Sequence, residues 1–145
     1  MADCIFCKIV AREVPAHVVF EDDQVLAFLD IHPVRTGHTL IIPKTHYSYV
    51  EELPSELMAH IAVLAHRFAQ LMMKVYQPMR VGMIVSGTDV PHMHFHVCPM
   101  HEKYDITSGQ YITSPNPTFA LPPIATPADL KQEAERLKAA LASSR

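Results

Sequence analysis

Three histidines alternate with apolar residues in the stretch VPHMHFHVCPM, which covers residues 90–100. In a β-strand successive side chains point to opposite faces, so His92, His94 and His96 would share one face while the apolar residues between them enter the core. Neighbouring imidazoles would be spaced by about 6.6–6.8 Å, and the outer pair would lie roughly 13 Å apart. Two neighbours could share a zinc ion, whose bonds to nitrogen are about 2.0–2.1 Å long, but all three could do so only if the strand bent.

Such a row suits the floor of a groove that holds a substrate at several points. A neutral imidazole is a good nucleophile at pH 7, because its ordinary pKa is about 6.5. The alternative is structural: one or two of the histidines would be half-buried strand residues that bond backbone carbonyls.

A second group of reactive side chains lies near the start of the chain, where Cys4 and Cys7 form a Cys-x-x-Cys pair. The chain contains an odd number of cysteines, three, the third being Cys98. In a reducing compartment this spacing indicates metal or redox chemistry rather than a structural disulfide.

The elements that must position these residues can be predicted from the apolar pattern and the turn residues. Short apolar runs bounded by Asp, Gly and Pro predict strands. We expect five of them, at His17–Phe20, Gln24–Asp30, His38–Pro43, Arg80–Ser86 and His92–Cys98.

Two helices are expected. The first begins at Pro54, and its apolar residues recur at spacings of three and four through Val75, with a second apolar band wide enough to serve a partner as well as the core. The last follows Thr126, a capping residue, and Pro127. The order of strands, helix and strands favours an α+β fold with an antiparallel sheet of about five strands. We expect residues 1–106 to form the main domain and 107–145 an arm and helix packed on it.

Composition restricts the class of protein. The 145 residues are 49% hydrophobic and 19% charged, with a formal net charge of −3. These values are typical of an ordinary globular protein and give no reason to expect nucleic acid or a membrane surface as partner. The first residues lack the pattern of a signal peptide and no apolar run approaches the roughly 20 residues of a membrane span, so we expect a cytoplasmic protein.

The histidine row and three further segments resemble the histidine triad (HIT) superfamily. HMHFHVC has the family's alternating histidine pattern, and DCIFCKIVAREVP, VFEDDQVLAFLDIHP and GHTLIIPKTHYSYVEEL are similar to its successive N-terminal segments, in the same order. The resemblance covers about residues 3–100. It implies an antiparallel sheet, a homodimer formed through the long helix, and a purine nucleotide bound with its α-phosphate over the histidines.

The resemblance also implies roles for individual histidines. His94 would be the nucleophile that forms a covalent nucleotidyl-histidine, and its second ring nitrogen should then donate to a backbone carbonyl. His96 would contact the α-phosphate or the bridging atom and stabilise charge there. His38 matches a histidine that supports the triad. We expect this mechanism to require no Mg²⁺.

Nucleotide-binding residues follow from the same resemblance. Asp30 matches the family's ribose-binding acid, and its alternative role is that of a turn residue before Pro33. The apolar slot for the base would be formed by Phe6, Ile9, Phe28 and Ile31, although each could equally be a core residue.

The phosphate loop departs from the family pattern, because SGTDVPH is shorter than the Gly-rich stretch of many members. Ser86, Gly87 and Asp89 are the residues that we expect to border the phosphate. Asp89 stands where a hydroxyl is common, and its carboxylate would repel a phosphate unless it were protonated or turned away.

Members that carry the N-terminal Cys-x-x-Cys hold zinc with four residues, and the resemblance implies that Cys4, Cys7, His46 and His92 do so here. Two thiolates and two imidazoles form a closed tetrahedral site, which is typical of structural zinc. A redox pair or two unlinked thiols is the alternative.

Three functions are therefore compatible with the sequence. The leading one is an enzyme that cleaves a nucleoside phosphoramidate, mixed anhydride or dinucleoside polyphosphate at the α-phosphate. The second is a regulatory or scaffold dimer that binds nucleotides with weak catalysis, and the third is a structural zinc module. An intact nucleophile favours the first.

Overall fold

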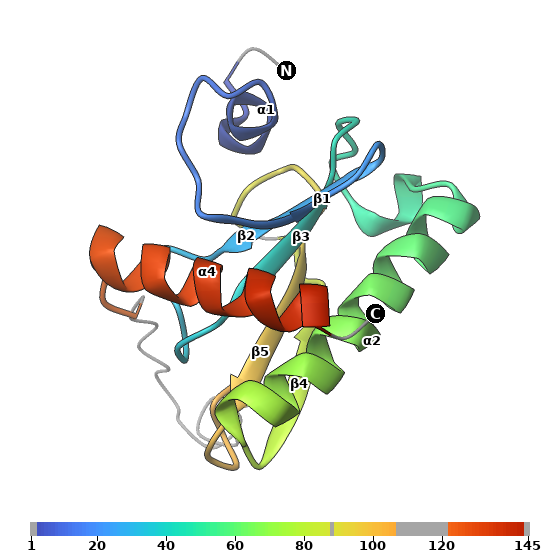
Figure 1. Cartoon of the computed structure of the whole chain (residues 1–145). Helices are drawn as coiled ribbons and strands as arrows, with labels where there is room; N and C mark the ends of the chain where they lie inside the picture. The colour runs from blue at the N-terminus through green and yellow to red at the C-terminus, as the bar shows by residue number, and fades with distance from the viewer. Residues whose placement is uncertain (1–2, 88, 107–121, 144–145) are drawn as a thin grey trace, which may run out of the picture.

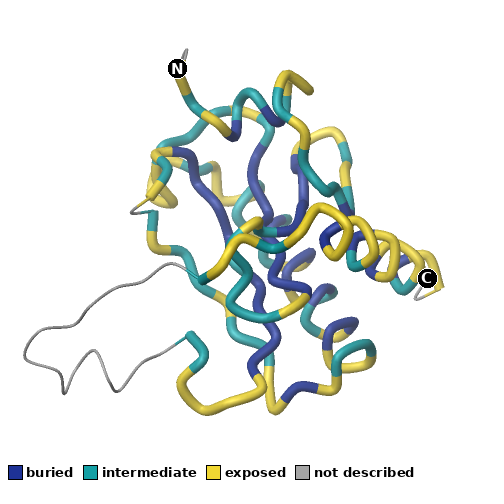
Figure 2. The backbone as a smooth tube through the Cα atoms, turned by 90° about the vertical axis from the view of Figure 1, so that its left-hand side faces the viewer, coloured by how far each residue is buried: buried dark blue, intermediate teal, exposed yellow. Residues whose placement is uncertain are grey.

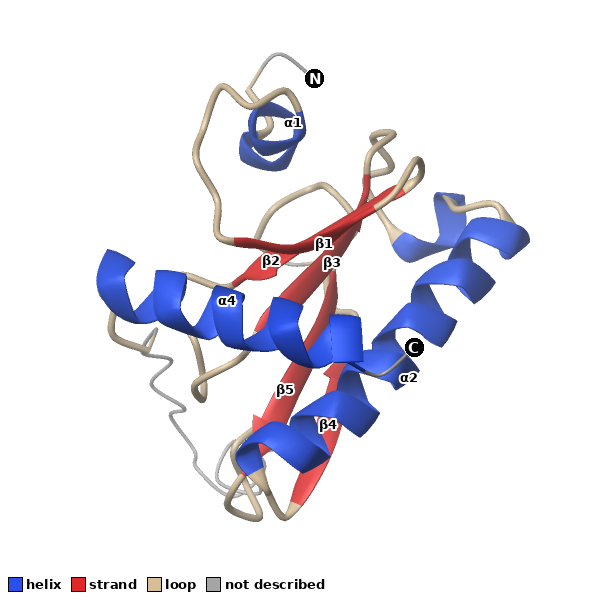
Figure 3. Ribbon diagram, viewed as in Figure 1, coloured by secondary structure: helices blue, strands red, loops and turns tan. Residues whose placement is uncertain are grey.

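The computed structural model describes residues 3–87, 89–106 and 122–143. Its centre is an antiparallel sheet in the order β1-β2-β3-β5-β4 (Figures 1 and 3). The strands are β1 (Val18–Glu21), β2 (Val25–Leu29), β3 (Thr39–Pro43), β4 (Arg80–Ile84) and β5 (Phe95–Met100). With the helices below, this arrangement is the α+β fold that the sequence predicts.

Strands β2 and β3, both inside the sheet, are buried along their whole length and pair with each other over five residues. The tight turn between β1 and β2 depends on Asp22, whose carboxylate accepts hydrogen bonds from the backbone N–H groups of Gln24 and Val25, both at 2.8 Å. Short polar side chains of this kind stabilise turns by satisfying the backbone locally.

Helices α2 (Ser55–Tyr76) and α4 (Pro127–Ser143) cover one face of the sheet, and Figure 1 shows both in front of the strands. Their apolar stripes, including Phe68 and Leu137, share one core cluster with Ile41 and Val97 of the sheet. Buried segments run through the middle of the molecule in Figure 2. Thr126 caps α4, since its Oγ1 accepts from the backbone N–H of Asp129 at 3.1 Å.

A short helix, α1 (Ile5–Val10), packs on the opposite face of the sheet. Phe6 and Ile9 of this helix form a second cluster with Phe28, Leu40 and other strand residues. The apolar pattern of the sequence does not predict α1, because six residues are too few for a helical period to be recognised. Its N-cap is Cys4, whose sulfur accepts from the backbone N–H of Cys7 at 3.4 Å.

The histidine strand begins later than the alternation predicts. Strand β5 starts at Phe95, so His92 and His94 precede the hydrogen-bonded ladder. Side chains nevertheless alternate, because Met93 and Phe95 both enter the core under α2 and α4. The remaining predicted strands differ from the observed ones by one or two residues at their ends.

A 3-10 turn, η1 (Val50–Glu52), leads into α2, which begins at Ser55 with Pro54 as its N-cap residue. Residues 107–121 of the expected arm lie outside the described residues, as does position 88 of the phosphate loop. Among the helices that are described, none is long and apolar enough to cross a membrane.

Candidate active site and metal centre

His94 and His96 lie on the face of the sheet that carries α1. His96 pairs with Leu40 across β3 and β5, and residues directly opposite in a ladder point to the same face. Leu40 belongs to the cluster under α1. The rings of His94 and His96 are adjacent, with centroids 4.9 Å apart, so the two imidazoles form one continuous surface.

One hydrogen bond sets the tautomer of His94. Its Nδ1 lies 2.7 Å from the carbonyl oxygen of His92, which can only accept, so Nδ1 carries the proton and donates. The Nε2 atom therefore keeps its lone pair. The side chain is only 3% exposed, and Phe6 packs against it edge to face with ring centroids 5.3 Å apart. The imidazole is thus held in the tautomer that a nucleophile requires.

The tautomers of His38 and His96 are set by a chain of hydrogen bonds that begins at a backbone amide. The N–H of Val34 donates to Nδ1 of His38 at 3.2 Å, which leaves the His38 proton on Nε2. That Nε2 lies 2.9 Å from Nδ1 of His96 and donates to it. His96 consequently carries its own proton on Nε2 and can donate it to a substrate.

Burial keeps both of these imidazoles neutral. Desolvation, together with the neighbouring His38 and His94, lowers the pKa of His96 to about 4, against the opposing effect of Asp30. Burial also lowers the pKa of His38, against the opposing effect of the Asp30 carboxylate. At pH 7 the pair therefore shares hydrogen bonds without net charge.

Asp30 follows β2 and performs two tasks with its two oxygens. Oδ1 accepts from the backbone N–H of His32 at 2.8 Å, as the turn role predicts. Oδ2 lies 3.8 Å from Nε2 of His38, so the carboxylate also borders the histidine pair. One acceptor oxygen is thus used locally while the other faces the site.

The predicted base slot is partly assembled. The rings of Phe6 and Phe28 meet edge to face with centroids 5.6 Å apart, and Ile9 packs in the same cluster. Phe6 also contacts the rings of His92 and His94. Ile31 differs, since its side chain is 53% exposed on the loop after β2. Three of the four residues therefore lie together, and Ile31 lies at the surface beside Asp30.

The loop before the triad contributes the remaining predicted residues. Ser86 and Asp89 are exposed, while Gly87 is half-buried with a φ of +70°. A side chain at Gly87 would meet the ring of Tyr49 at 3.3 Å, so both the backbone conformation and the neighbour favour glycine. Asp89 is close to the triad in sequence, and its exposure leaves it free to turn toward solvent.

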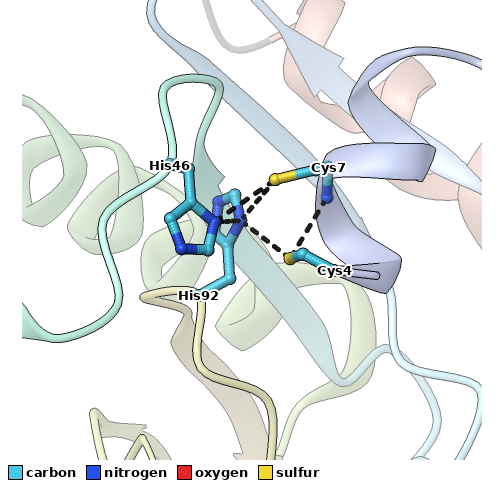
Figure 4. A group of neighbouring side chains, drawn as sticks. All are labelled: Cys4, Cys7, His46 and His92. Carbon is cyan, nitrogen blue, oxygen red and sulfur yellow. Dashed lines mark hydrogen bonds between the residues drawn. The ribbon is translucent and has the colours of Figure 1, made fainter. Parts of the chain in front are cut away.

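The four predicted metal ligands converge from three parts of the chain (Figure 4). Cys4 is the N-cap residue of α1 and Cys7 lies within that helix, while His46 comes from the loop after β3 and His92 from the segment before β5. Nδ1 of His92 lies 3.4 Å from the Cys4 sulfur and 3.5 Å from the Cys7 sulfur. Nδ1 of His46 lies 3.3 Å from the Cys7 sulfur and 3.2 Å from Nδ1 of His92.

These spacings fit a tetrahedral metal. Zinc bonds of about 2.3 Å to sulfur and 2.0–2.1 Å to nitrogen give edges of roughly 3.5 Å between sulfur and nitrogen and 3.3 Å between two nitrogens. Nε2 of His92 donates to the carbonyl oxygen of Pro43 at 2.9 Å, so its Nδ1 offers a lone pair to the cluster. Burial, with the neighbouring Cys4, raises the pKa of the Cys7 thiol, and a bound cation would oppose that rise.

A second group of potential ligands is formed by Asp30, His38 and His96, whose ligand atoms also lie within 4.8 Å of one another. The hydrogen bond from Val34 argues against a metal here. A metal on Nε2 of His38 would require the proton on Nδ1, and that atom already faces the Val34 N–H. The geometry fits a hydrogen-bonded pair better than a metal centre.

The fold and the histidine row together define a class of proteins in which an antiparallel sheet presents paired imidazoles beside a Cys/His cluster. The chain belongs to the HIT domain family, whose profile matches residues 11–103.

Relatives with named activities include the adenosine 5'-monophosphoramidase of Saccharomyces cerevisiae, which is 36% identical over 115 residues, or 79% of this chain and 71% of the relative. The adenylylsulfatase of Arabidopsis thaliana is 34% identical over 106 residues, covering 70% of this chain and 54% of the relative. Both names describe hydrolases. Among solved structures, a zinc-bound histidine triad family protein from Mycobacterium smegmatis superimposes with a TM-score of 0.78 at 30% identity, over 99% of this chain and 96% of that one.

Sequence reasoning misses three residues that the structure adds to the site. The N–H of Val34 determines the tautomer of His38, and Arg35 is bound through its side chain to Asp105. A backbone donor has no signature in the sequence. The Arg35–Asp105 pair joins residues 70 positions apart, which no local pattern reveals.

Proposed function

We propose that the protein hydrolyses purine nucleotides at the α-phosphate through a covalent nucleotidyl-histidine. The observation that carries the proposal is the pair of complementary tautomers: His94 offers a lone pair on Nε2, and the adjacent His96 offers a proton on Nε2. A nucleophile and a hydrogen-bond donor side by side are what phosphoryl-centre substitution requires.

In the first half-reaction, Nε2 of His94 attacks the α-phosphorus. The nitrogen–phosphorus bond forms as the bond to the leaving group breaks, and the leaving group departs with the bonding electrons. His96 donates its Nε2 proton in a hydrogen bond to the phosphate oxygens or the bridging atom, where negative charge grows. In the second half-reaction, water attacks the phosphorus and releases His94. Overall one water is consumed, its hydroxyl on phosphorus and its proton on the leaving group.

The substrate class that we propose is an adenosine phosphoramidate, a mixed anhydride or a dinucleoside polyphosphate. The names of the yeast and Arabidopsis relatives support the first two, since an AMP-linked amine and an AMP-linked sulfate are cleaved at the same phosphorus. Asp30 would accept from the ribose hydroxyls through Oδ2, with the base near Phe6, Phe28 and Ile9. Ser86, Gly87 and Asp89 would border the phosphate.

We propose zinc as a structural ion on Cys4, Cys7, His46 and His92, supported by the ligand spacing. When bound, it would hold α1 against the segment that leads into β5, and the chemistry would proceed without Mg²⁺. A thiolate site of this kind suits a reducing compartment, and we propose the cytoplasm as location.

A homodimer is the proposed assembly. Val63 and Met73 are exposed on α2, Met79 and Met83 are exposed on or beside β4, and β4 ends the sheet among the described strands. An apolar helix face beside an edge strand suits pairing with a second copy. Residues 107–145 would form an arm and helix of the same domain, as the packing of α4 in the main core suggests.

The test is His94→Asn, which keeps a hydrogen-bonding side chain of similar size but removes the nucleophile. We expect hydrolysis of an AMP-linked phosphoramidate to fall by at least about 10³-fold, while AMP still binds with a dissociation constant within a few fold of wild type. His66→Asn, on the exposed side of α2, is the matched control and should leave turnover unchanged. Wild-type turnover in His94→Asn contradicts the mechanism. If wild type binds AMP but turns nothing over, the scaffold alternative is favoured.

A further inference from the structure

A side-chain pair outside the histidine row joins the loop after β2 to the segment after β5. Nε of Arg35 donates to Oδ2 of Asp105 at 2.9 Å, and Nη2 donates to Oδ1 at 2.6 Å. Oδ2 of Asp105 also accepts from the backbone N–H groups of His101 at 2.7 Å and Glu102 at 2.9 Å. A bidentate pair with further backbone donors is among the stronger and more directional hydrogen-bond arrangements in proteins.

The pair is well shielded on the carboxylate side. The Asp105 side chain is 7% exposed and that of Arg35 is 34% exposed, whereas the Glu102 carboxylate, 3.6 Å from Arg35, is largely in solvent. The Arg35 guanidinium holds the pKa of the Asp105 carboxyl down at about 2. The pair therefore stays ionised throughout the neutral range and constrains Arg35 more than an ordinary surface ion pair would.

The backbone of this same loop determines the His38 tautomer. The carbonyl oxygen of Arg35 accepts from the backbone N–H of His38 at 3.0 Å. Val34, the preceding residue, donates its N–H to Nδ1 of His38. The peptide group whose N–H sets the tautomer is thus one residue away from the side chain that Asp105 holds.

The loop has a second anchor on its other side. Gly37 adopts a φ of +92°, and a side chain there would lie 2.5 Å from the ring of Tyr76. Tyr76 in turn donates to Glu133 of α4 at 2.9 Å. The Arg35–Asp105 pair and the close approach of Gly37 to Tyr76 therefore hold the turn on the side that follows Val34.

We propose that Arg35 and Asp105 form a positioning pair that holds the Val34 N–H on Nδ1 of His38, and so keeps the His96 proton on Nε2, facing the substrate. The proposal rests on the hydrolytic function proposed above, because it explains how His96 is kept as a donor. Neither residue touches the reacting atoms.

A positioning pair is needed because the neutral His38–His96 pair can adopt two tautomeric states that contain the same number of protons. In the alternative, His38 carries its proton on Nδ1 and accepts at Nε2 from Nδ1–H of His96, which leaves a lone pair on Nε2 of His96. That lone pair would face the phosphate oxygens and repel them. The hydrogen bond from Val34 selects the productive arrangement, since a proton on Nδ1 of His38 would meet the Val34 N–H.

The experiment compares Arg35→Ala, Arg35→Lys and Asp105→Asn with wild type, and uses Lys138→Ala as control because Lys138 forms an exposed pair with Glu135 on α4. Nitrogen-15 NMR of labelled histidine reports which ring nitrogen of His38 and of His96 carries the proton. In Arg35→Ala and Asp105→Asn we expect the proton of each histidine to move to its other ring nitrogen. In Arg35→Lys, which can keep one hydrogen bond, we expect a mixture of the two tautomers. In Lys138→Ala we expect the wild-type tautomers.

Kinetics on an AMP-linked phosphoramidate gives the second readout. We expect kcat to fall by roughly tenfold in Arg35→Ala and Asp105→Asn while KM changes by less than about twofold, because charge on the phosphate grows in the transition state. Unchanged tautomers in folded Arg35→Ala or Asp105→Asn overturn the proposal. If Arg35→Ala does not fold, Arg35→Lys and Asp105→Asn decide the result in the same way.

The tautomer readout requires no turnover, so the two proposals fail separately. A tautomer shift in a protein that never forms a nucleotidyl-histidine supports the positioning pair and contradicts the hydrolytic function. Normal wild-type turnover, with tautomers that stay unchanged in the variants, supports the hydrolytic function and contradicts the positioning pair.

Discussion

At the scale of single residues, hydrogen-bond partners distinguish histidines that look equivalent in the sequence. His92 faces the cysteines, His94 donates to a carbonyl, and His96 accepts from His38. The alternation predicts that these side chains share a face, because the period of a strand is a local property. The tautomers could not be predicted, since they depend on the Val34 N–H and the His92 carbonyl, which are backbone groups placed by the fold.

The depressed pKa of His96 predicts how acid affects stability. An unfolded chain binds the proton near pH 6.5, while the folded protein resists it until about pH 4, so the free energy of unfolding decreases as pH falls through this window. The full effect is on the order of 3 kcal/mol. Denaturant unfolding of wild type and His96→Asn between pH 7 and 4 measures it. We expect the variant to lose less stability, and equal losses in both proteins would contradict the assignment.

At the scale of elements, helix α1 connects the Cys/His cluster to His94, the proposed nucleophile. Its N-cap is Cys4 and it contains Cys7, and Phe6, between the two in sequence, packs on the rings of His92 and His94. The Cys-x-x-Cys spacing and the family resemblance predict the ligand set, but not the helix, because its hydrophobic face consists of two buried residues. The alternation also places the start of β5 three residues too early, since it continues before the ladder begins at Phe95.

The proposed zinc site on Cys4, Cys7, His46 and His92 predicts that stability depends on zinc. We expect purified protein to contain about one zinc ion per chain, and the double variant Cys4→Ser/Cys7→Ser to lose it and melt at a lower temperature. Metal analysis and thermal unfolding measure both. Cys98→Ala, a buried thiol outside the cluster, should keep the metal. Metal-free protein whose Tm does not respond to a chelator would refute a structural zinc.

The packing of the Phe6 side chain should make a large contribution to the stability of the fold. Its ring is 8% exposed and contacts Phe28 and two histidines, so Phe6→Ala should lower the free energy of unfolding by about 3–5 kcal/mol. Phe6→Leu should recover much of that loss. A loss below about 1 kcal/mol in Phe6→Ala, measured by denaturant unfolding, would show that α1 is not held through this ring.

At the scale of the whole molecule, an apolar surface remains beside the end of the sheet. The sequence predicts a second apolar band on the long helix, and in the structure Val63 is 69% exposed and Met83, on β4, is 40% exposed. A sequence pattern cannot say which band enters the core, because that depends on how α2 crosses the sheet. The structure buries residues of both bands, including Leu64 and Phe68 of the first and Ala65 and Met72 of the second, and the exposed Val63 belongs to neither.

The proposed homodimer predicts a mass near twice the 16.3 kDa of one chain. Val63→Lys/Met83→Lys should shift the protein toward the monomer, because two charges would be buried at the interface. Light scattering coupled to size-exclusion chromatography measures this. Ile124→Lys is the control, since Ile124 is equally exposed but lies before α4. A monomeric wild type, or a double variant that stays dimeric, would exclude this interface.

The most direct test of the proposed hydrolysis through a nucleotidyl-histidine is to trap that covalent intermediate. Protein mixed with an AMP-linked phosphoramidate, quenched within the first turnover, digested and sequenced by mass spectrometry should carry one adenylyl group on the peptide that contains residues 92–96, attached to His94. His94→Asn should carry none. Steady turnover with no adenylylated peptide would contradict the covalent mechanism. An adenylyl group on His92 or His96 instead would contradict His94 as the nucleophile.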